Sequence, residues 1–110
     1  MRVWYQVRDL DAGRGFYRDV LGFTETNFDG LEGWSHMERG EMQIALAEGE
    51  PEEAGVATID VEDAKAEAER LREQDVEVGT VLELINEVRL LDVFDPDGNR
   101  VQLAQELSAG

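Results

Sequence analysis

The chain contains one short pattern twice. Val7-Arg8-Asp9-Leu10-Asp11-Ala12 ends an alternating apolar segment and opens an amphipathic stretch, and Val61-Glu62-Asp63-Ala64-Lys65-Ala66 does the same about half the chain later. A change from a period of two to a period near 3.6 indicates a strand followed by a helix. A duplicated strand–helix–strands unit predicts two half-sheets that face one another across a shared groove, where a small molecule would bind.

Turn residues divide each half into the same order of elements. The predicted strands are residues 2–7, 23–28, 34–38, 41–47, 56–61, 76–84, 88–94 and 100–105. The first predicted helix follows an N-cap at Asp9 or Asp11 and ends at Gly22, and the second covers 63–74. This order predicts an α+β fold, in which two βαβββ repeats form a curved mixed sheet around a groove with the helices on the outer face.

The length of 110 residues predicts one domain. We expect the first βαβββ unit at 1–47, a polar linker at 48–55, the second unit at 56–105 and a frayed tail at 106–110.

Alternation assigns the strand residues to two faces. The face expected to meet the helices is apolar: Val3, Tyr5, Val7, Ile44, Leu46, Ala57, Ile59, Leu91, Val93, Val101 and Leu103. The other face mixes polar and aromatic groups, which is typical of a binding groove: Arg2, Trp4, Gln6, Gln43, Ala45, Val56, Thr58, Asp60, Leu90, Asp92, Phe94, Arg100 and Gln102.

Acidic residues dominate the charge, with 26 Asp and Glu against 10 Lys and Arg, for a formal net charge of −16. Nucleic acid and anionic membranes need a basic face, so neither is an expected partner. Scarce lysine and excess acid fit either adaptation to high salt or an ordinary acidic protein from a GC-rich genome. The chain has no cysteine and no apolar run long enough for a membrane span. The first strand begins too early for a signal peptide, so we expect a cytoplasmic protein.

Two stretches carry a family resemblance. One runs from Val7-Arg8-Asp9-Leu10-Asp11 through Phe16-Tyr17-Arg18-Asp19-Val20-Leu21-Gly22-Phe23, and the other is Phe94-Asp95-Pro96-Asp97-Gly98-Asn99-Arg100-Val101-Gln102-Leu103. With them the chain resembles the vicinal oxygen chelate superfamily, which includes glyoxalase I, bleomycin-resistance proteins, fosfomycin-resistance enzymes and extradiol dioxygenases. The resemblance implies the paired βαβββ fold over nearly the whole chain. It does not imply one reaction, because this fold serves lyases, transferases, dioxygenases and non-catalytic drug binders.

Metal-binding members of the superfamily place His or Glu at four strand positions that face the groove. The resemblance puts these positions at Arg2, Ala45, Val56 and Gln102. Arginine is cationic, alanine and valine have no donor atom, and a lone amide oxygen is a weak ligand. We therefore expect no metal cofactor.

The single histidine, His36, has three possible roles. It could bind a metal with Glu38 or Asp60, act as a general base, or be a polar residue in mid-sheet or near a dimer interface. Arg2, beside Gln102 by the resemblance, could hold an anionic ligand or instead pair with Asp60, Asp92 or Glu38.

The aromatic residues Trp4, Trp34 and Phe94 form either a wall that stacks on a flat ligand or ordinary packing. Asp95 and Asp97 lie in an Asp-Pro-Asp-Gly turn, and turn chemistry accounts for both.

The expected function is binding of a small organic ligand by a homodimer of this superfamily without a metal. The alternative is a lyase, isomerase or dioxygenase-like enzyme with a non-standard metal site or acid–base catalysis by Asp60, His36 or Glu38. An accessory domain with a degenerate groove is a third possibility. No catalytic residue is assigned. The predicted groove residues are Arg2, Trp4, Gln6, Trp34, His36, Gln43, Thr58, Asp60, Asp92, Phe94 and Gln102.

Overall fold

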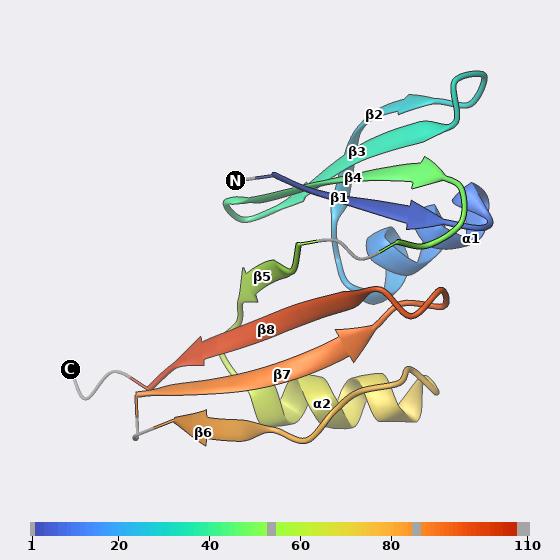
Figure 1. The fold of residues 1–110 in the computed structure, drawn as a ribbon. Coiled ribbons are helices and arrows are strands. Elements are labelled where there is room, and N and C mark those ends of the chain that lie inside the picture. The colour runs from blue at the N-terminus through green and yellow to red at the C-terminus, as the bar shows by residue number, and fades with distance from the viewer. Residues whose placement is uncertain (1, 53–54, 85–86, 108–110) are drawn as a thin grey trace.

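The computed structural model describes residues 2–52, 55–84 and 87–107. The molecule is elongated, with extents of 48 × 27 × 24 Å. Its elements follow the predicted order (Figure 1): β1 (Arg2–Val7), α1 (Leu10–Gly15), the π-helix η1 (Phe16–Val20), β2 (Thr24–Asp29), β3 (Trp34–Arg39), β4 (Met42–Glu48), β5 (Ala57–Asp60), α2 (Ala64–Glu73), β6 (Leu82–Leu84), β7 (Val88–Phe94) and β8 (Arg100–Glu106).

Each half of the chain forms a four-stranded mixed sheet. The strand orders are β1-β4-β3-β2 and β5-β8-β7-β6, so the two halves have the same topology. In both, the first strand pairs in parallel with the fourth, and the other pairs are antiparallel. Figure 1 shows β2 and β6 at opposite ends of the molecule, while β1 and β5 lie on the inner edges. The α+β fold of paired βαβββ units is confirmed.

Both principal helices begin at an aspartate of the repeated pattern. The Asp9 carboxylate accepts from the backbone N–H of Ala12, and the Asp63 carboxylate accepts from that of Ala66, each at 3.1 Å. The first N-cap is therefore Asp9, not Asp11, and the helix continues as a π-helix. Of the helices in the described ranges, none combines the length and apolar character that crossing a membrane requires.

The predicted helix-facing residues form the core. Every one of them is at most 5% exposed. Helix α2 adds Ala64, Ala68 and Leu71 to this core. Full burial of a Val, Leu or Ile side chain contributes about 1.5–3 kcal/mol, so these residues are a main source of stability for both sheets.

The prediction of a strand over 76–84 is wrong for most of that range. Only Leu82–Leu84 forms β6, and Val78 makes an isolated bridge to Val93. The irregular stretch includes Gly79, which has no side chain to pack in a sheet. Elsewhere the strand ends differ from prediction by about one residue. In the predicted frayed tail, Glu106 ends β8 and the N–H of Leu107 donates to Glu87, while 108–110 lie outside the described residues.

Candidate functional site

The open face of the first sheet, opposite its buried core residues, holds half of the predicted groove. Strands β1, β4 and β3 align these side chains in rows that cross the sheet, because partners in register on one face stand side by side. The rows are Gln43–Glu38, Trp4–Ala45–His36 and Gln6–Ala47–Trp34, and the backbone of Arg2 is in register with Gln43.

Small residues on β4 separate the aromatic ones. Ala45 lies between Trp4 and His36, and Ala47 is next to Trp34. The rings of Trp34 and His36 are in contact, with centroids 4.9 Å apart and planes tilted by 36°. Trp4 is 49% exposed, whereas Ala45 is fully buried although its register puts it on the open face. We attribute this burial to the larger side chains on either side of Ala45. We call Trp4, Ala45, His36, Ala47 and Trp34, which share this open face, the aromatic trough.

The open face of the second sheet is polar near its centre. Thr58, Gln102 and Asp92 form one row across β5, β8 and β7. An oxygen of Asp92 lies 3.6 Å from a guanidinium nitrogen of Arg100, whose side chain is half exposed. An ion pair so exposed adds little stability, and both groups remain accessible to a polar ligand.

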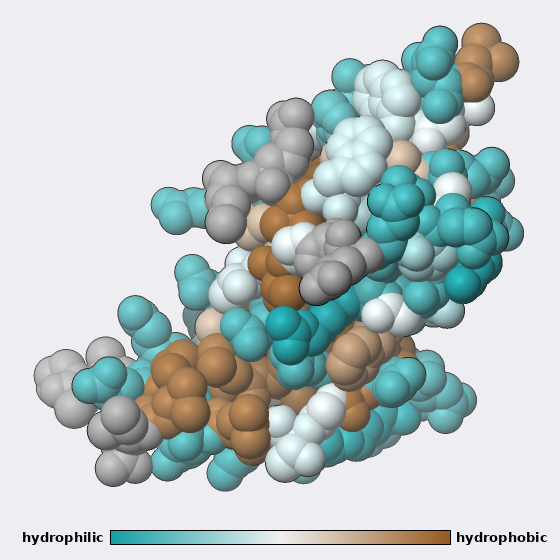
Figure 2. All heavy atoms as spheres, viewed as in Figure 1, coloured by the Kyte–Doolittle hydropathy of each residue, from teal (hydrophilic) through white to brown (hydrophobic). Residues whose placement is uncertain are grey.

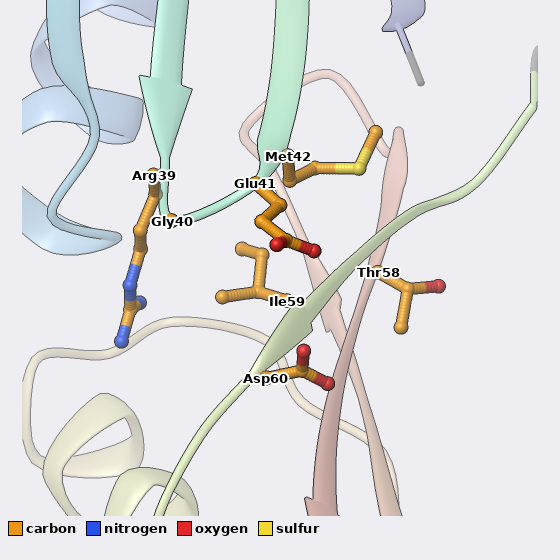
Figure 3. A pocket seen from close by; sticks show the side chains of 7 residues that line it. All are labelled: Arg39, Gly40, Glu41, Met42, Thr58, Ile59 and Asp60. Carbon is orange, nitrogen blue, oxygen red and sulfur yellow. The ribbon is translucent and has the colours of Figure 1, made fainter.

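A cavity of about 410 Å³ lies between the β3–β4 turn and β5 (Figure 3). This volume is within the range of small-molecule sites. Two residues of the predicted groove, Thr58 and Asp60, line it together with Arg39, Gly40, Glu41, Met42 and Ile59. In Figure 3 the carboxylates of Glu41 and Asp60 point into the space between the two segments.

Arg39 also lines this cavity, and contacts with Leu21 and Glu67 fix its side chain. Its guanidinium donates to the carbonyl of Leu21 at 2.7 Å and lies 3.7 Å from the Glu67 carboxylate on α2. Neither Arg39 nor Glu41 was predicted to line a site, because a hairpin turn gives no periodic signal of which strand it approaches.

Three other predicted residues line separate cavities. His36 and Gln43 border a space of about 80 Å³ on the first sheet. Phe94 borders one of about 380 Å³ with the helical residue Phe16 and with Val76, which follows α2. The structure therefore brings Trp4, Trp34 and His36 onto one face, while Phe94 belongs to the other sheet and lines a space beside the helices.

The four metal positions implied by the resemblance hold poor donors. Ala45 is buried, Val56 is half-buried just before β5, and Gln102 lies between Thr58 and Asp92. In the part of the chain that the structure describes, no group of three or more His, Asp or Glu side chains could hold a metal. The residues present do not fit the metal centre of the superfamily.

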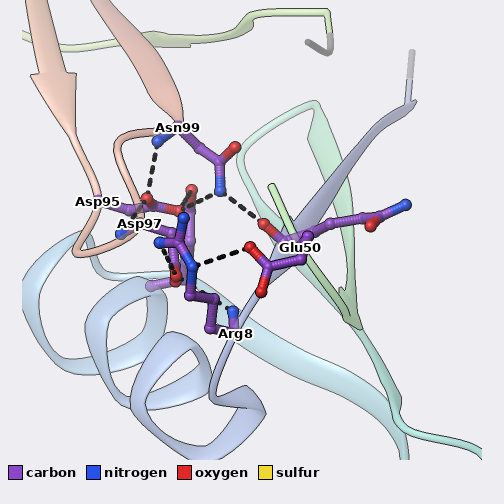
Figure 4. A network of polar contacts seen from close by, with 7 residues as sticks. Arg8, Glu50, Asp95, Asp97 and Asn99 are labelled. Carbon is purple, nitrogen blue, oxygen red and sulfur yellow. Dashed lines mark hydrogen bonds and ion pairs between the residues drawn. The ribbon is translucent and has the colours of Figure 1, made fainter. Parts of the chain in front are cut away.

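Hydrogen bonds join the two halves of the chain (Figure 4). The Tyr17 hydroxyl donates to Oδ2 of Asp95 at 2.8 Å, and Nδ2 of Asn99 donates to the carbonyl of Gln6 at 2.9 Å. Burial and the Asp95 carboxylate together raise the pKa of Tyr17, so its hydroxyl stays protonated. Arg8 pairs with both Glu50 and Asp97. Turn chemistry alone was thus an incomplete account of Asp95 and Asp97.

A second tyrosine bridges the inner edges of the sheets. The Tyr5 hydroxyl donates to the carbonyl of Arg100 at 2.6 Å and accepts from the N–H of Ala57 at 2.9 Å. Burial raises the pKa of Tyr5, and the bond from Ala57 opposes that rise. Tyr5 and Tyr17 stack with centroids 5.9 Å apart. Both residues therefore set how the two open faces sit relative to each other.

Comparison with known proteins identifies the family. The sequence profile of the glyoxalase/bleomycin resistance protein/dioxygenase superfamily matches residues 2–103, almost the whole chain. The chain belongs to the glyoxalase/bleomycin resistance protein/dioxygenase superfamily. A search of curated protein sequences finds no significant match.

Several solved structures share the fold of this chain. An integron cassette protein from the mobile metagenome of the Halifax Harbour sewage outfall has a TM-score of 0.83 at 20% identity, with 96% of each chain covered. Lactoylglutathione lyase from Agrobacterium tumefaciens has a TM-score of 0.79 at 20% identity, covering 100% of this chain and 95% of the other. A bleomycin resistance determinant encoded on transposon Tn5 has 0.74 at 18% identity, with 96% of each covered. At these identities the likeness shows the superfamily fold, not a shared reaction.

Proposed function

We propose that this member of the superfamily binds a small, flat organic ligand without a resident metal, as a homodimer. The observation that carries the proposal is the aromatic trough, in which Trp4, Trp34 and His36 surround Ala45 and Ala47 on an open sheet face. Aromatic rings supply large, rigid contact area for a planar ligand. The polar row on the second sheet supplies hydrogen-bonding groups that orient it.

The surroundings of His36 favour a binding role over acid–base catalysis. A catalytic base is usually oriented by a carboxylate or another fixed partner. The cross-strand partners of His36 are Ala45 and Asn27, and its ring contacts Trp34. We therefore assign His36 to the aromatic wall of the trough.

Intrinsic fluorescence tests the proposal without labels. The chain has only two tryptophans, and both lie on the trough face. A ligand that stacks there changes the emission of the folded protein. We would titrate the full chain with a cationic probe, proflavine, and an anionic one, 8-anilinonaphthalene-1-sulfonate. We expect saturable quenching by at least one of them, weakened at least about tenfold by Trp34→Ala (about 1.4 kcal/mol).

Two controls test where the probe binds and whether the protein holds a metal. Phe28→Ala removes an exposed aromatic residue from the opposite face of the same sheet, and it should leave probe affinity unchanged. Elemental analysis and titration with nickel, zinc, iron and manganese test the absence of a metal. Quenching that does not saturate would refute ligand binding at the trough, and stoichiometric tight metal binding would refute the metal-free proposal.

A further inference from the structure

The cavity of about 380 Å³ beside the helices is separate from the proposed ligand site. Its walls come from η1, from the segment 74–77 at the end of α2, and from residues 94–96 at the end of β7. In Figure 1 the ends of α2 and β7 lie on the same side of the molecule, below α1. We call this space the helix-end cavity. It shares no lining residue with the aromatic trough, and its volume is within the range of small-molecule sites.

The inner walls of the helix-end cavity are apolar and partly aromatic. Phe16 is 9% exposed and packs edge-on against Tyr17, with centroids 5.4 Å apart. Phe94, Val20 and Val76 are half-buried and complete these walls. In Figure 2, hydrophobic residues reach the surface along β7 and the segment after α2, and hydrophilic residues surround them. Aromatic and branched side chains give the apolar body of a ligand a rigid contact surface.

Hydrogen bonds hold the walls in place. The N–H of Phe94 donates to the carbonyl of Glu77 at 3.0 Å, which attaches the segment after α2 to β7. The buried Asp95 carboxylate accepts from the Tyr17 hydroxyl and from Nδ2 of Asn99, so its hydrogen bonds are already made within the protein. A site whose walls are fixed before binding loses little entropy when a ligand enters.

The rim of the helix-end cavity carries unpaired acidic groups. Asp75 and Glu77 are exposed, and within the described part of the chain neither carboxylate has an ion-pair partner. The residues that line the cavity include no Lys or Arg. Arg70 donates to the carbonyl of Val20, but it is paired with Glu67 at 2.7 Å. The rim therefore favours a positively charged group.

Asp75 adopts a conformation that usually belongs to glycine. Its φ is 59°, and it follows Gln74, the C-cap of α2. The N–H of Val76 donates to the carbonyl of Leu71, and that of Asp75 donates to the carbonyl of Arg72, each at 3.0 Å. This is a Schellman motif, in which glycine commonly occupies the position of Asp75 because it has no Cβ. The aspartate is strained there, so stability alone does not favour a carboxylate at this point of the rim.

We propose that the helix-end cavity is a second binding site, for a small organic cation with an apolar body, of the arylalkylammonium class. The apolar body packs among Phe16, Val76 and Phe94, and the ammonium group lies beside Asp75 and Glu77. The formal net charge of −16 raises the local concentration of such a cation. This site is independent of the aromatic trough and of the ligand proposed for it.

Titration of the full chain, followed by backbone amide chemical shifts, tests the proposal with two probes of opposite charge, 2-phenylethylammonium and 3-phenylpropanoate. We expect saturable binding of the cation, with shifts at the amides of Val76 and Glu77, and at least about tenfold weaker binding of the anion. Asp75→Asn removes the charge but keeps a residue that tolerates positive φ, and it should raise the Kd of the cation about threefold or more. Glu32→Gln, at the exposed tip of the β2–β3 hairpin, is the matched control and should leave this Kd unchanged.

Asp75→Gly separates binding from stability. It relieves the strain at positive φ, so it should raise the melting temperature while it weakens binding of the cation as Asp75→Asn does. A melting temperature that falls together with the affinity would show that Asp75 is structural, and it would count against the site. Equal affinity for the two probes, or a Kd that neither Asp75 variant changes, would overturn the proposal.

A variant of the aromatic trough distinguishes the two sites. Trp34→Ala should leave the Kd of 2-phenylethylammonium unchanged, whereas Phe94→Ala should raise it at least about fivefold. A loss of affinity in Trp34→Ala would place this cation in the trough and would refute the second site. Binding at Val76 and Glu77 without tryptophan quenching by the trough probes would contradict only the proposed function.

Discussion

The hydroxyl of Tyr17 donates to the carboxylate of Asp95 across 78 residues of sequence, with both side chains buried. Tyr17 comes from the π-helix of the first half, and Asp95 comes from the β7–β8 turn of the second half. Asn99 adds a bond from that turn to the same carboxylate and another to the backbone of β1. The bond therefore ties the two halves of the fold together at the point where their sheets approach.

Tyr17→Phe should lower the free energy of unfolding by about 1–3 kcal/mol, because it leaves a buried carboxylate oxygen with one partner fewer. Urea denaturation measures the loss. A cycle with Asp95→Asn and the double variant isolates the pair, and we expect a coupling energy above about 0.5 kcal/mol. Simple additivity of the two single changes would show that the bond does not couple the halves.

The Arg14–Glu25 pair should make stability depend on pH. Arg14 donates to both Glu25 oxygens, at 2.6 and 2.8 Å, and Ser35 donates to one of them. The hydrogen bond from Arg14 holds the pKa of Glu25 below its ordinary value of 4.5. A carboxyl group with a depressed pKa in the folded state contributes stability above its unfolded pKa and loses it as pH falls through the folded one.

We therefore expect Glu25→Gln to be less stable than wild type at pH 7, with the difference shrinking as the pH falls below about 4.5. Chemical denaturation at a series of pH values measures it. Glu32→Gln, which changes an exposed carboxylate at the hairpin tip, is the control and should show a much smaller effect. A difference between Glu25→Gln and wild type that does not change with pH would count against the ion pair.

Filling the trough should block the ligand. Ala47 is half-buried beside Trp34, so Ala47→Leu places a larger side chain among the residues of the trough. We expect probe affinity to fall at least about tenfold in the fluorescence titration. Ala66→Leu makes the same change on the exposed face of α2 and should bind as wild type does. An unchanged probe affinity in Ala47→Leu would show that the ligand binds elsewhere.

Salt should raise the melting temperature of the isolated chain. With a formal net charge of −16, repulsion between acidic groups opposes the compact state, and added KCl screens it. A melting temperature that stays level between about 0.1 M and about 1 M KCl would count against adaptation to high salt.

The element order was predictable because it follows from local patterns. Alternation in Val3, Tyr5 and Val7 identified a strand and its buried face, and the repeated aspartates marked both helix starts. The irregular segment before β6 was mispredicted because its apolar residues alternate as in a strand, whereas only three residues there form one.

The candidate site was predictable only by face. The alternation of side chains along each strand predicted that Trp4 and Gln43 lie on the open face of the first sheet, and the strand register agrees. The alternation does not predict that Phe94 lines a cavity beside Phe16, or that Arg39 donates to the carbonyl of Leu21. Those contacts depend on how strand ends and turns pack, and the spacing of apolar residues in strands or helices does not predict that packing.

The sequence by itself determined the two repeats, their strand faces and their helix starts, because each depends on residue type and near neighbours. Only the tertiary structure decided that Tyr17 meets Asp95 and that Ala45 stands between Trp4 and His36. Such contacts join residues far apart in the chain, and they arise when two packed sheets settle against each other.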